Sequence, residues 1–137
     1  MAATDKIHQP VKNALIKDGW TITAEPYSIA IEEEYLFADM SAERITADSR
    51  VEMIVVEVKT FGGRSLIHAL EEALGQYRIY RQYLAETLPD CKVYLAVSDQ
   101  AYDLLEKRPT FRFLMRHKEF ALIVVAIDKE EIQQWIE

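Results

Sequence analysis

Apolar positions along this chain of 137 residues repeat with two different periods. Spacings of three and four residues match the turn of an α-helix and predict helices over residues 4–17, 65–87, 99–105, 111–116 and 128–136. Pro10 shifts the expected start of the first helix to His8 or Gln9. Alternating or continuous apolar runs predict strands over residues 20–25, 27–31, 35–38, 92–97 and 120–127. The charged residues 32–34 are expected to form a loop or a helix start.

The most informative pattern lies in residues 37–59, which we interpret as two strands joined by a tight polar turn. With a three-residue turn at residues 48–50, Glu57 pairs with Ser41 and Lys59 pairs with Asp39. In that register Asp39, Glu57 and Lys59 share one face of the sheet, because side chains alternate along a strand. Burying a lone charge is costly, so Glu57 and Lys59 are expected to be solvated, paired or bound to a metal ion.

The order of these elements predicts a single α/β domain over residues 1–137, with a central mixed β-sheet flanked by helices. An apolar fraction of 50% and a charged fraction of 28% are typical of a globular protein. No segment approaches the roughly 20 apolar residues that span a bilayer, so we expect no membrane association and a cytoplasmic location. The single cysteine, Cys91, excludes an internal disulfide and a thiolate zinc site.

The formal net charge of −7 argues against a protein that coats DNA by neutralising its phosphates. It leaves open a metal site that supplies positive charge locally. The three histidines His8, His68 and His117 have no metal-ligand spacing, and we interpret them as surface or helix-lining residues.

Asp39, followed eighteen residues later by the run Glu57, Val58 and Lys59, resembles the PD-(D/E)xK nuclease signature, with Ala38 in place of the proline. Two carboxylates from adjacent strands, helped by the Val58 carbonyl, can hold Mg²⁺ or Mn²⁺ and leave positions for water and phosphate oxygens. The lysine ammonium then orients or activates the attacking water and stabilises developing negative charge. The alternative for the tripeptide is an ordinary solvated ion pair on a sheet face.

Gln76 and Tyr80 strengthen this resemblance, because they supply the Q-xxx-Y pattern that follows the catalytic strand in the RecB-like branch of these nucleases. The resemblance implies that Asp39, Glu57 and Lys59 are catalytic, and that Asp39, Glu57 and Val58 are the metal ligands. It also implies that Gln76 and Tyr80 orient the substrate or support the ligands.

Across nearly its whole length the chain also resembles the XisH family, the fdxN-element excision controlling factors of cyanobacteria. The segments that carry this resemblance include VKNALIKDGWTIT (11–23), ADMSAERITAD (38–48), VVEVKTF (55–61) and ALGQYRIYR (73–81). It implies a restriction-endonuclease-like fold and a role in controlled DNA excision during heterocyst differentiation, together with an XisI-type protein or a recombinase. Two functions stay open: a Mg²⁺-dependent DNA endonuclease, and a catalytically idle binding module on the same fold. A homodimer is a further open alternative.

Overall fold

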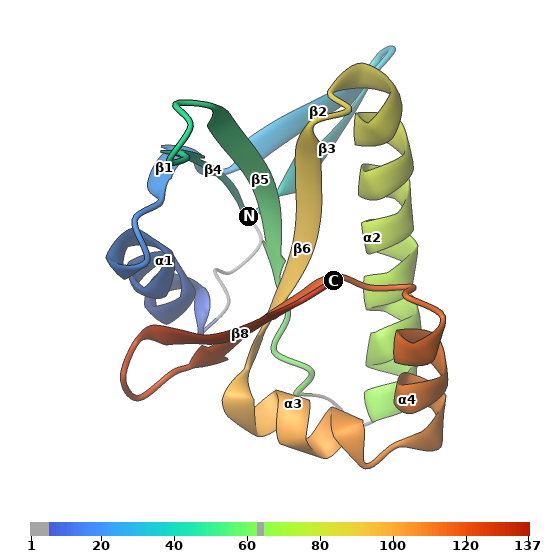
Figure 1. The fold of residues 1–137 in the computed structure, drawn as a ribbon. Helices are drawn as coiled ribbons and strands as arrows, with labels where there is room; N and C mark the ends of the chain where they lie inside the picture. Colours follow the sequence, from blue (N-terminus) through green and yellow to red (C-terminus); the bar gives the residue numbers. More distant parts are fainter. Residues whose placement is uncertain (1–5, 63–64) are drawn as a thin grey trace.

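A mixed β-sheet of six strands forms the centre of the protein in the computed structural model, which describes residues 6–62 and 65–137 (Figure 1). Its strand order is β1-β4-β5-β6-β7-β8. The inner strands β5, β6 and β7 run parallel, whereas β1, β4 and β8 pair with their neighbours in antiparallel fashion. The bounds are Thr21–Ala24 for β1, Met40–Ile45 for β4, Val51–Val58 for β5, Cys91–Ser98 for β6, Leu122–Ala126 for β7 and Glu131–Ile136 for β8. The predicted mixed α/β class is confirmed.

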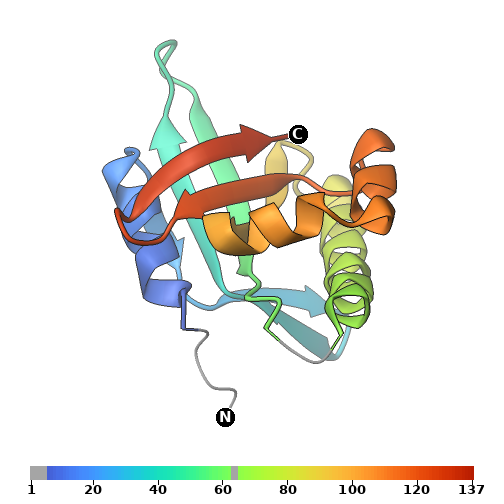
Figure 2. The same cartoon turned by 90° about the horizontal axis from the view of Figure 1, so that it is seen from below.

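Helices cover both faces of this sheet (Figure 2). Helix α1 (His8–Lys17) covers one face, where its buried side shares a hydrophobic core with Ile54, Val56 and Val58 of β5. Helix α2 (Leu66–Thr87) lies on the other face, where Val55 is buried beneath it. Helices α3 (Asp99–Glu106) and α4 (Pro109–Arg116), together with a separate hairpin of β2 (Tyr27–Ile31) and β3 (Glu34–Ala38), complete this second layer. Strand β5 is therefore enclosed on both sides along its C-terminal half.

Both long helical predictions agree with the structure where it describes them. Helix α1 begins at His8, as Pro10 indicated, and the predicted positions Thr4 and Asp5 lie outside the described residues. Ser65 caps α2 by accepting a hydrogen bond from the His68 amide, as expected of a serine before a helix. Among the described residues, no helix is long and apolar enough to cross a membrane.

The predicted closing helix over residues 128–136 is wrong, because this segment forms strand β8 and pairs with β7. Ile132 and Trp135 are three residues apart, as on one face of a helix, yet both pack into the core on the α1 side of the sheet. The register between the strands shifts between Gln134 and Ile132, which leaves Gln133 as an extra residue in a bulge. A bulge resets the alternation of side chains, so a three-residue spacing can occur within a strand.

The register predicted for the β4–β5 hairpin is also wrong, by two residues. Ser41 pairs with Val55 rather than with Glu57, and the connection is a longer loop over residues 46–50. Thr46 closes this loop, since its amide donates to the Arg50 carbonyl at 2.7 Å. A shift of the strand register by two residues keeps every side chain on its predicted face of the sheet. Glu57 therefore lies opposite Asp39 and still points to the predicted face.

The charged run at residues 32–34 forms the turn between β2 and β3 rather than a helix start. Glu32 has a φ of +54°, and Glu34 is already the first residue of β3. The hairpin that it closes leads the chain into Asp39.

Candidate functional site

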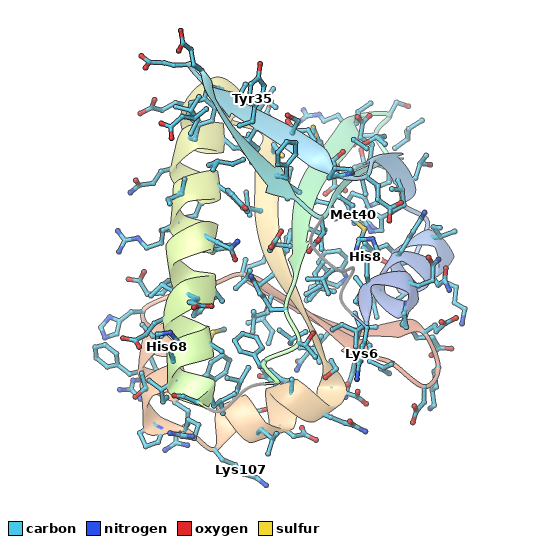
Figure 3. The ribbon with its side chains drawn as sticks, turned by 180° about the vertical axis from the view of Figure 1, so that it is seen from behind. Lys6, His8, Tyr35, Met40, His68 and Lys107 are labelled. Atoms are coloured by element: carbon cyan, nitrogen blue, oxygen red, sulfur yellow. The ribbon has the colours of Figure 1, made fainter. Side chains whose placement is uncertain are left out.

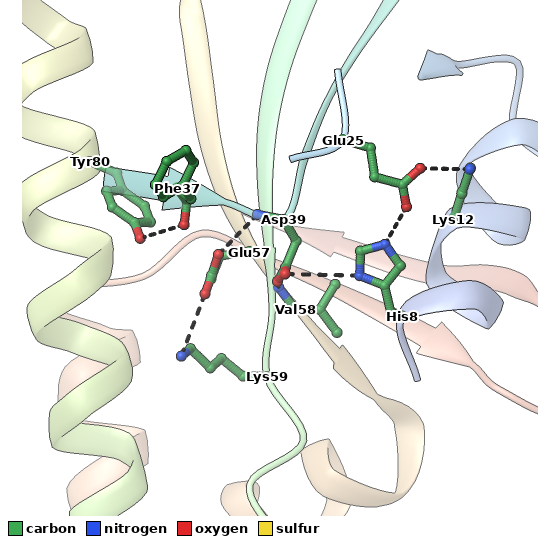
Figure 4. A network of polar contacts seen from close by, with 9 residues as sticks. All are labelled: His8, Lys12, Glu25, Phe37, Asp39, Glu57, Val58, Lys59 and Tyr80. Atoms are coloured by element: carbon green, nitrogen blue, oxygen red, sulfur yellow. Dashed lines mark hydrogen bonds and ion pairs between the residues drawn. The ribbon is translucent and has the colours of Figure 1, made fainter. Parts of the chain in front are cut away.

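The structure brings Asp39 and Glu57 together where β3 ends and β4 begins (Figure 4). The Asp39 amide donates to Oε1 of Glu57 at 3.1 Å, and the Val58 amide donates to Oδ2 of Asp39 at 2.7 Å. Each carboxylate thus accepts a hydrogen bond from the backbone of the segment that carries the other. Backbone amides therefore hold both side chains in place.

Lys59 extends this site from the end of β5 toward α2. Its Nζ lies 3.6 Å from Oε2 of Glu57, whose side chain is only 9% exposed. Each carboxylate therefore has one oxygen that accepts no backbone hydrogen bond, and these two oxygens have different neighbours. Oε2 of Glu57 faces Lys59, whereas Oδ1 of Asp39 faces the imidazole of His8 (Figure 4).

Burial, followed by the negative charge of Asp39, raises the pKa of Glu57 from 4.5 to about 7. Lys59 acts in the opposite direction but does not cancel these effects. A carboxyl group that titrates near neutral pH indicates a site that is short of positive charge.

Tyr80 and Gln76 reach this region from α2 in different ways. Tyr80 is buried, and its hydroxyl donates to the Phe37 carbonyl at 3.1 Å, two residues before Asp39. Burial, followed by the charges of Glu57 and Asp39, raises the pKa of Tyr80 to about 12, so the hydroxyl stays protonated. The Oε1 atom of Gln76, one helical turn earlier, is buried and accepts no hydrogen bond from the described residues.

Replacing Tyr80 with phenylalanine is expected to lower the free energy of unfolding by about 1 kcal/mol, because the Phe37 carbonyl loses its donor. Tyr35→Phe, at a side chain that is largely exposed, is the matched control and should change little. Urea denaturation of both variants measures the difference. Equal losses in the two proteins would contradict a specific role for the Tyr80 hydroxyl in holding β3 beside the site.

His8 is a site residue that the sequence patterns did not reveal. It is buried against the sheet, whereas His68 lies on the outer side of α2 (Figure 3). Its Nε2 bonds to Oε2 of Glu25, and its Nδ1 lies 3.9 Å from Oδ1 of Asp39. Of the two interpretations given for the histidines, the surface one is wrong for His8, which lines the buried side of α1. The sequence did not reveal its place in the site, because α1 and the β3–β4 junction meet only in the folded chain.

The donor atoms around Asp39 fit a hard divalent cation. Among the described residues no three His, Cys, Asp or Glu side chains converge as a ready metal cluster. Asp39 and Glu57 could each supply a carboxylate oxygen and Val58 its carbonyl, and Mg²⁺ commonly uses one or two carboxylates and keeps several waters. The raised pKa of Glu57 agrees with this fit, because a cation would relieve the repulsion between the two carboxylates.

Together, the fold and the site define a mixed α/β protein whose central sheet holds two carboxylates and a lysine at one strand end. A comparison with protein families matches residues 1–133 to the XisH protein family, and the chain belongs to that family. A search of curated proteins finds no match.

Two solved structures are similar to this one over nearly the whole chain. An XisH family protein from Nostoc punctiforme PCC 73102 is 35% identical, with a TM-score of 0.85, over 97% of this chain and all of that one. A fdxN element excision controlling factor protein from Anabaena variabilis is 34% identical, with a TM-score of 0.84, over 96% of this chain and 98% of the other.

Proposed function

We propose that this protein is a Mg²⁺-dependent DNA endonuclease of the restriction-endonuclease-like fold that acts in the excision of a DNA element. The observation that carries this proposal is the pair of Asp39 and Glu57, locked together by backbone hydrogen bonds with Lys59 beside them. The relative from Anabaena variabilis, described as a fdxN element excision controlling factor, supports the biological setting.

Asp39, Glu57 and the Val58 carbonyl would hold the cation. In a strand the amide and carbonyl of one residue point to the same side, and the Val58 amide points to Asp39. The Val58 carbonyl therefore lies on the side of β5 where Asp39 sits. When bound, Mg²⁺ would polarise the scissile phosphate and acidify a water molecule.

Lys59 supplies the remaining positive charge of the reaction. Its ammonium carries three donors on a flexible stem and has Glu57 as its partner at 3.6 Å, so it can turn toward an attacking water or a phosphate oxygen. There it orients the water and stabilises negative charge as the phosphodiester bond breaks. Tyr80 keeps β3 in place, and Gln76 is the buried acceptor next to it on α2.

Asp39→Asn is the sharpest first test of this function. The amide keeps the size of the carboxylate but removes its charge, so metal-dependent cleavage should fall at least a hundredfold. Asp48→Asn, in the exposed loop of the β4–β5 hairpin, is the matched control and should cleave normally.

The assay follows cleavage of duplex, single-stranded and branched DNA with Mg²⁺, with Mn²⁺ and with EDTA. Cleavage that persists in EDTA, or that Asp39→Asn leaves unchanged, would contradict the proposal.

The second candidate is a nuclease-fold binding module that regulates a recombinase or pairs with an XisI-type protein. It is favoured by the net charge of −7 and by the separate neighbours of the two free carboxylate oxygens. A protein partner suits an acidic surface better than bare duplex DNA does. Absence of cleavage with every DNA form and metal, together with an XisI-type complex that survives Lys59→Ala, would favour this candidate.

A further inference from the structure

A pocket of about 370 Å³ lies beside α2, away from Asp39 and Glu57. Its walls come from the C-terminal half of α2, the start of β6, the segment before β7 and the residue after β8, which can be followed in Figure 1. Strands β5 and β6 run parallel, so the start of β6 and the end of β5 lie at opposite ends of the sheet. The pocket is therefore separate from the candidate site.

The wall of this pocket is mainly apolar. Val93 and Phe120 are buried beneath it, whereas Ala85 and Pro89 line it closer to the solvent. Pockets of a few hundred Å³ with an apolar lining and a small number of polar groups are the usual binding sites of small organic molecules. The volume and the lining therefore fit a ligand with an apolar body.

Positive charge gathers around this apolar wall. Arg81, Lys92 and Lys118 line the pocket, and Glu137 is the one acidic side chain among the described residues that line it. Glu137 is already engaged, because its Oε1 accepts from Nζ of Lys92 at 3.2 Å and from the hydroxyl of Tyr94. Three cations against one carboxylate leave a local charge of +2 on a protein whose net charge is −7.

Arg81 and Lys118 are the cations without an acidic partner, since neither forms an ion pair within the part of the chain that the structure describes. The Arg81 guanidinium instead lies over the ring of Tyr77, 5.2 Å from its centroid. Tyr77 is only 3% exposed, and its hydroxyl accepts from the Ala121 amide at 3.2 Å. Burial raises the pKa of Tyr77, so the hydroxyl keeps its own proton for donation.

We propose that this pocket binds a small organic anion, whose charged group meets Arg81 and Lys118 and whose apolar body packs against Phe120. A guanidinium matches the geometry of carboxylate and phosphate oxygens, and the Tyr77 hydroxyl adds a third donor. An inorganic ion would leave the apolar wall facing water, and a neutral molecule would leave both cations without a partner. This assignment does not depend on the proposed nuclease function.

Anilinonaphthalene sulfonate tests the assignment, because its fluorescence rises on an apolar surface. N-phenylnaphthylamine is the matched neutral probe, since it lacks only the sulfonate. Arg81→Met and Lys118→Met keep an apolar stem and remove the charge. Each should raise the Kd of the sulfonate about tenfold and change binding of the neutral amine little. Arg78→Met, at an exposed position of α2, is the matched control and should affect neither probe.

Cys91 reports where the probe sits, because it lines the pocket and is the single cysteine of the chain. Burial raises the pKa of Cys91 to about 11, so its alkylation by iodoacetamide is followed at pH 9. A saturating amount of the sulfonate should slow this alkylation several-fold in the original protein. The same concentration should protect Cys91 much less in Arg81→Met.

Three outcomes would overturn the assignment or part of it. Sulfonate fluorescence without protection of Cys91 would place the probe on another apolar surface, such as the exposed Tyr35 and Phe37, and so would overturn the site. Equal losses for the two probes in Arg81→Met would overturn the role of the cations. Displacement of the sulfonate by inorganic phosphate as readily as by phenyl phosphate would overturn the role of the apolar wall.

Discussion

Replacing Lys59 with methionine is expected to lower the rate of metal-dependent DNA cleavage about 10² to 10³-fold, the usual cost of losing one donor that stabilises transition-state charge. Methionine keeps the length and the apolar stem of lysine but carries no charge. Mg²⁺ binding should remain, because Asp39, Glu57 and the Val58 carbonyl are still present. The substitution should therefore slow the chemical step of cleavage and leave the affinity for Mg²⁺ largely unchanged.

Single-turnover cleavage at saturating Mg²⁺ measures this effect, and calorimetry measures metal binding in the same preparations. The assay is best made at pH 8 or above, because Lys59 lowers the pKa of Glu57 and its removal favours the protonated carboxyl. Lys107→Met, at the exposed end of α3, is the matched control. A cleavage rate that is equal in Lys59→Met and Lys107→Met would remove Lys59 from the mechanism.

Replacing Glu57 with glutamine is expected to stabilise the metal-free protein at pH 8 and to abolish metal-dependent cleavage. The pKa of Glu57 is raised in the folded protein, from 4.5 to about 7. Between these values the folded state binds more protons than the unfolded state, so the stability that Glu57 contributes falls as the pH rises through this window. The complete loss of stability across this window corresponds to roughly 3 kcal/mol. Glutamine has the same shape but does not ionise, so the variant does not undergo this loss.

Urea denaturation in EDTA at pH 5 and at pH 8 measures this difference between the original protein and Glu57→Gln. The gain in stability should be present at pH 8 and small at pH 5, and Glu33→Gln should show neither effect. Adding Mg²⁺ at pH 8 should stabilise the original protein more than the variant, since the variant lacks one of the two charged ligands of the ion. A variant that is less stable than the original protein at pH 8 would show that the charge of Glu57 does not destabilise the folded state.

Local patterns were sufficient for most of the elements around the site. The apolar run of β5 is continuous because the strand is covered on both faces, so a carboxylate within that run, Glu57, stands out in the sequence. Ser65 and Pro89 bracket α2 by capping and helix-breaking chemistry that acts within a few residues. The sequence was therefore sufficient to predict that Asp39, Glu57 and Lys59 lie near one another.

Local patterns failed where the relevant contact is distant in the chain. The three-residue spacing of Ile132 and Trp135 fits a helix as well as a bulged strand, and only pairing with β7 selects the strand. The register of the β4–β5 hairpin depended on a loop length that the turn residues alone did not fix.

The amino-acid sequence alone indicated the family through a resemblance over nearly the whole chain, the mixed α/β class through local periodicity, and the candidate residues Asp39, Glu57 and Lys59 through a short motif. The tertiary structure alone decided where the carboxylate oxygens point and that His8 joins them. The oxygens are directed by the pairing of Asp39 with Glu57 and Val58, about eighteen residues apart. The place of His8 depends on α1 packing against the β3–β4 junction, a contact between segments about thirty residues apart that no local pattern encodes. Asp39 is thereby placed between Val58 and His8, and Glu57 is left facing Lys59.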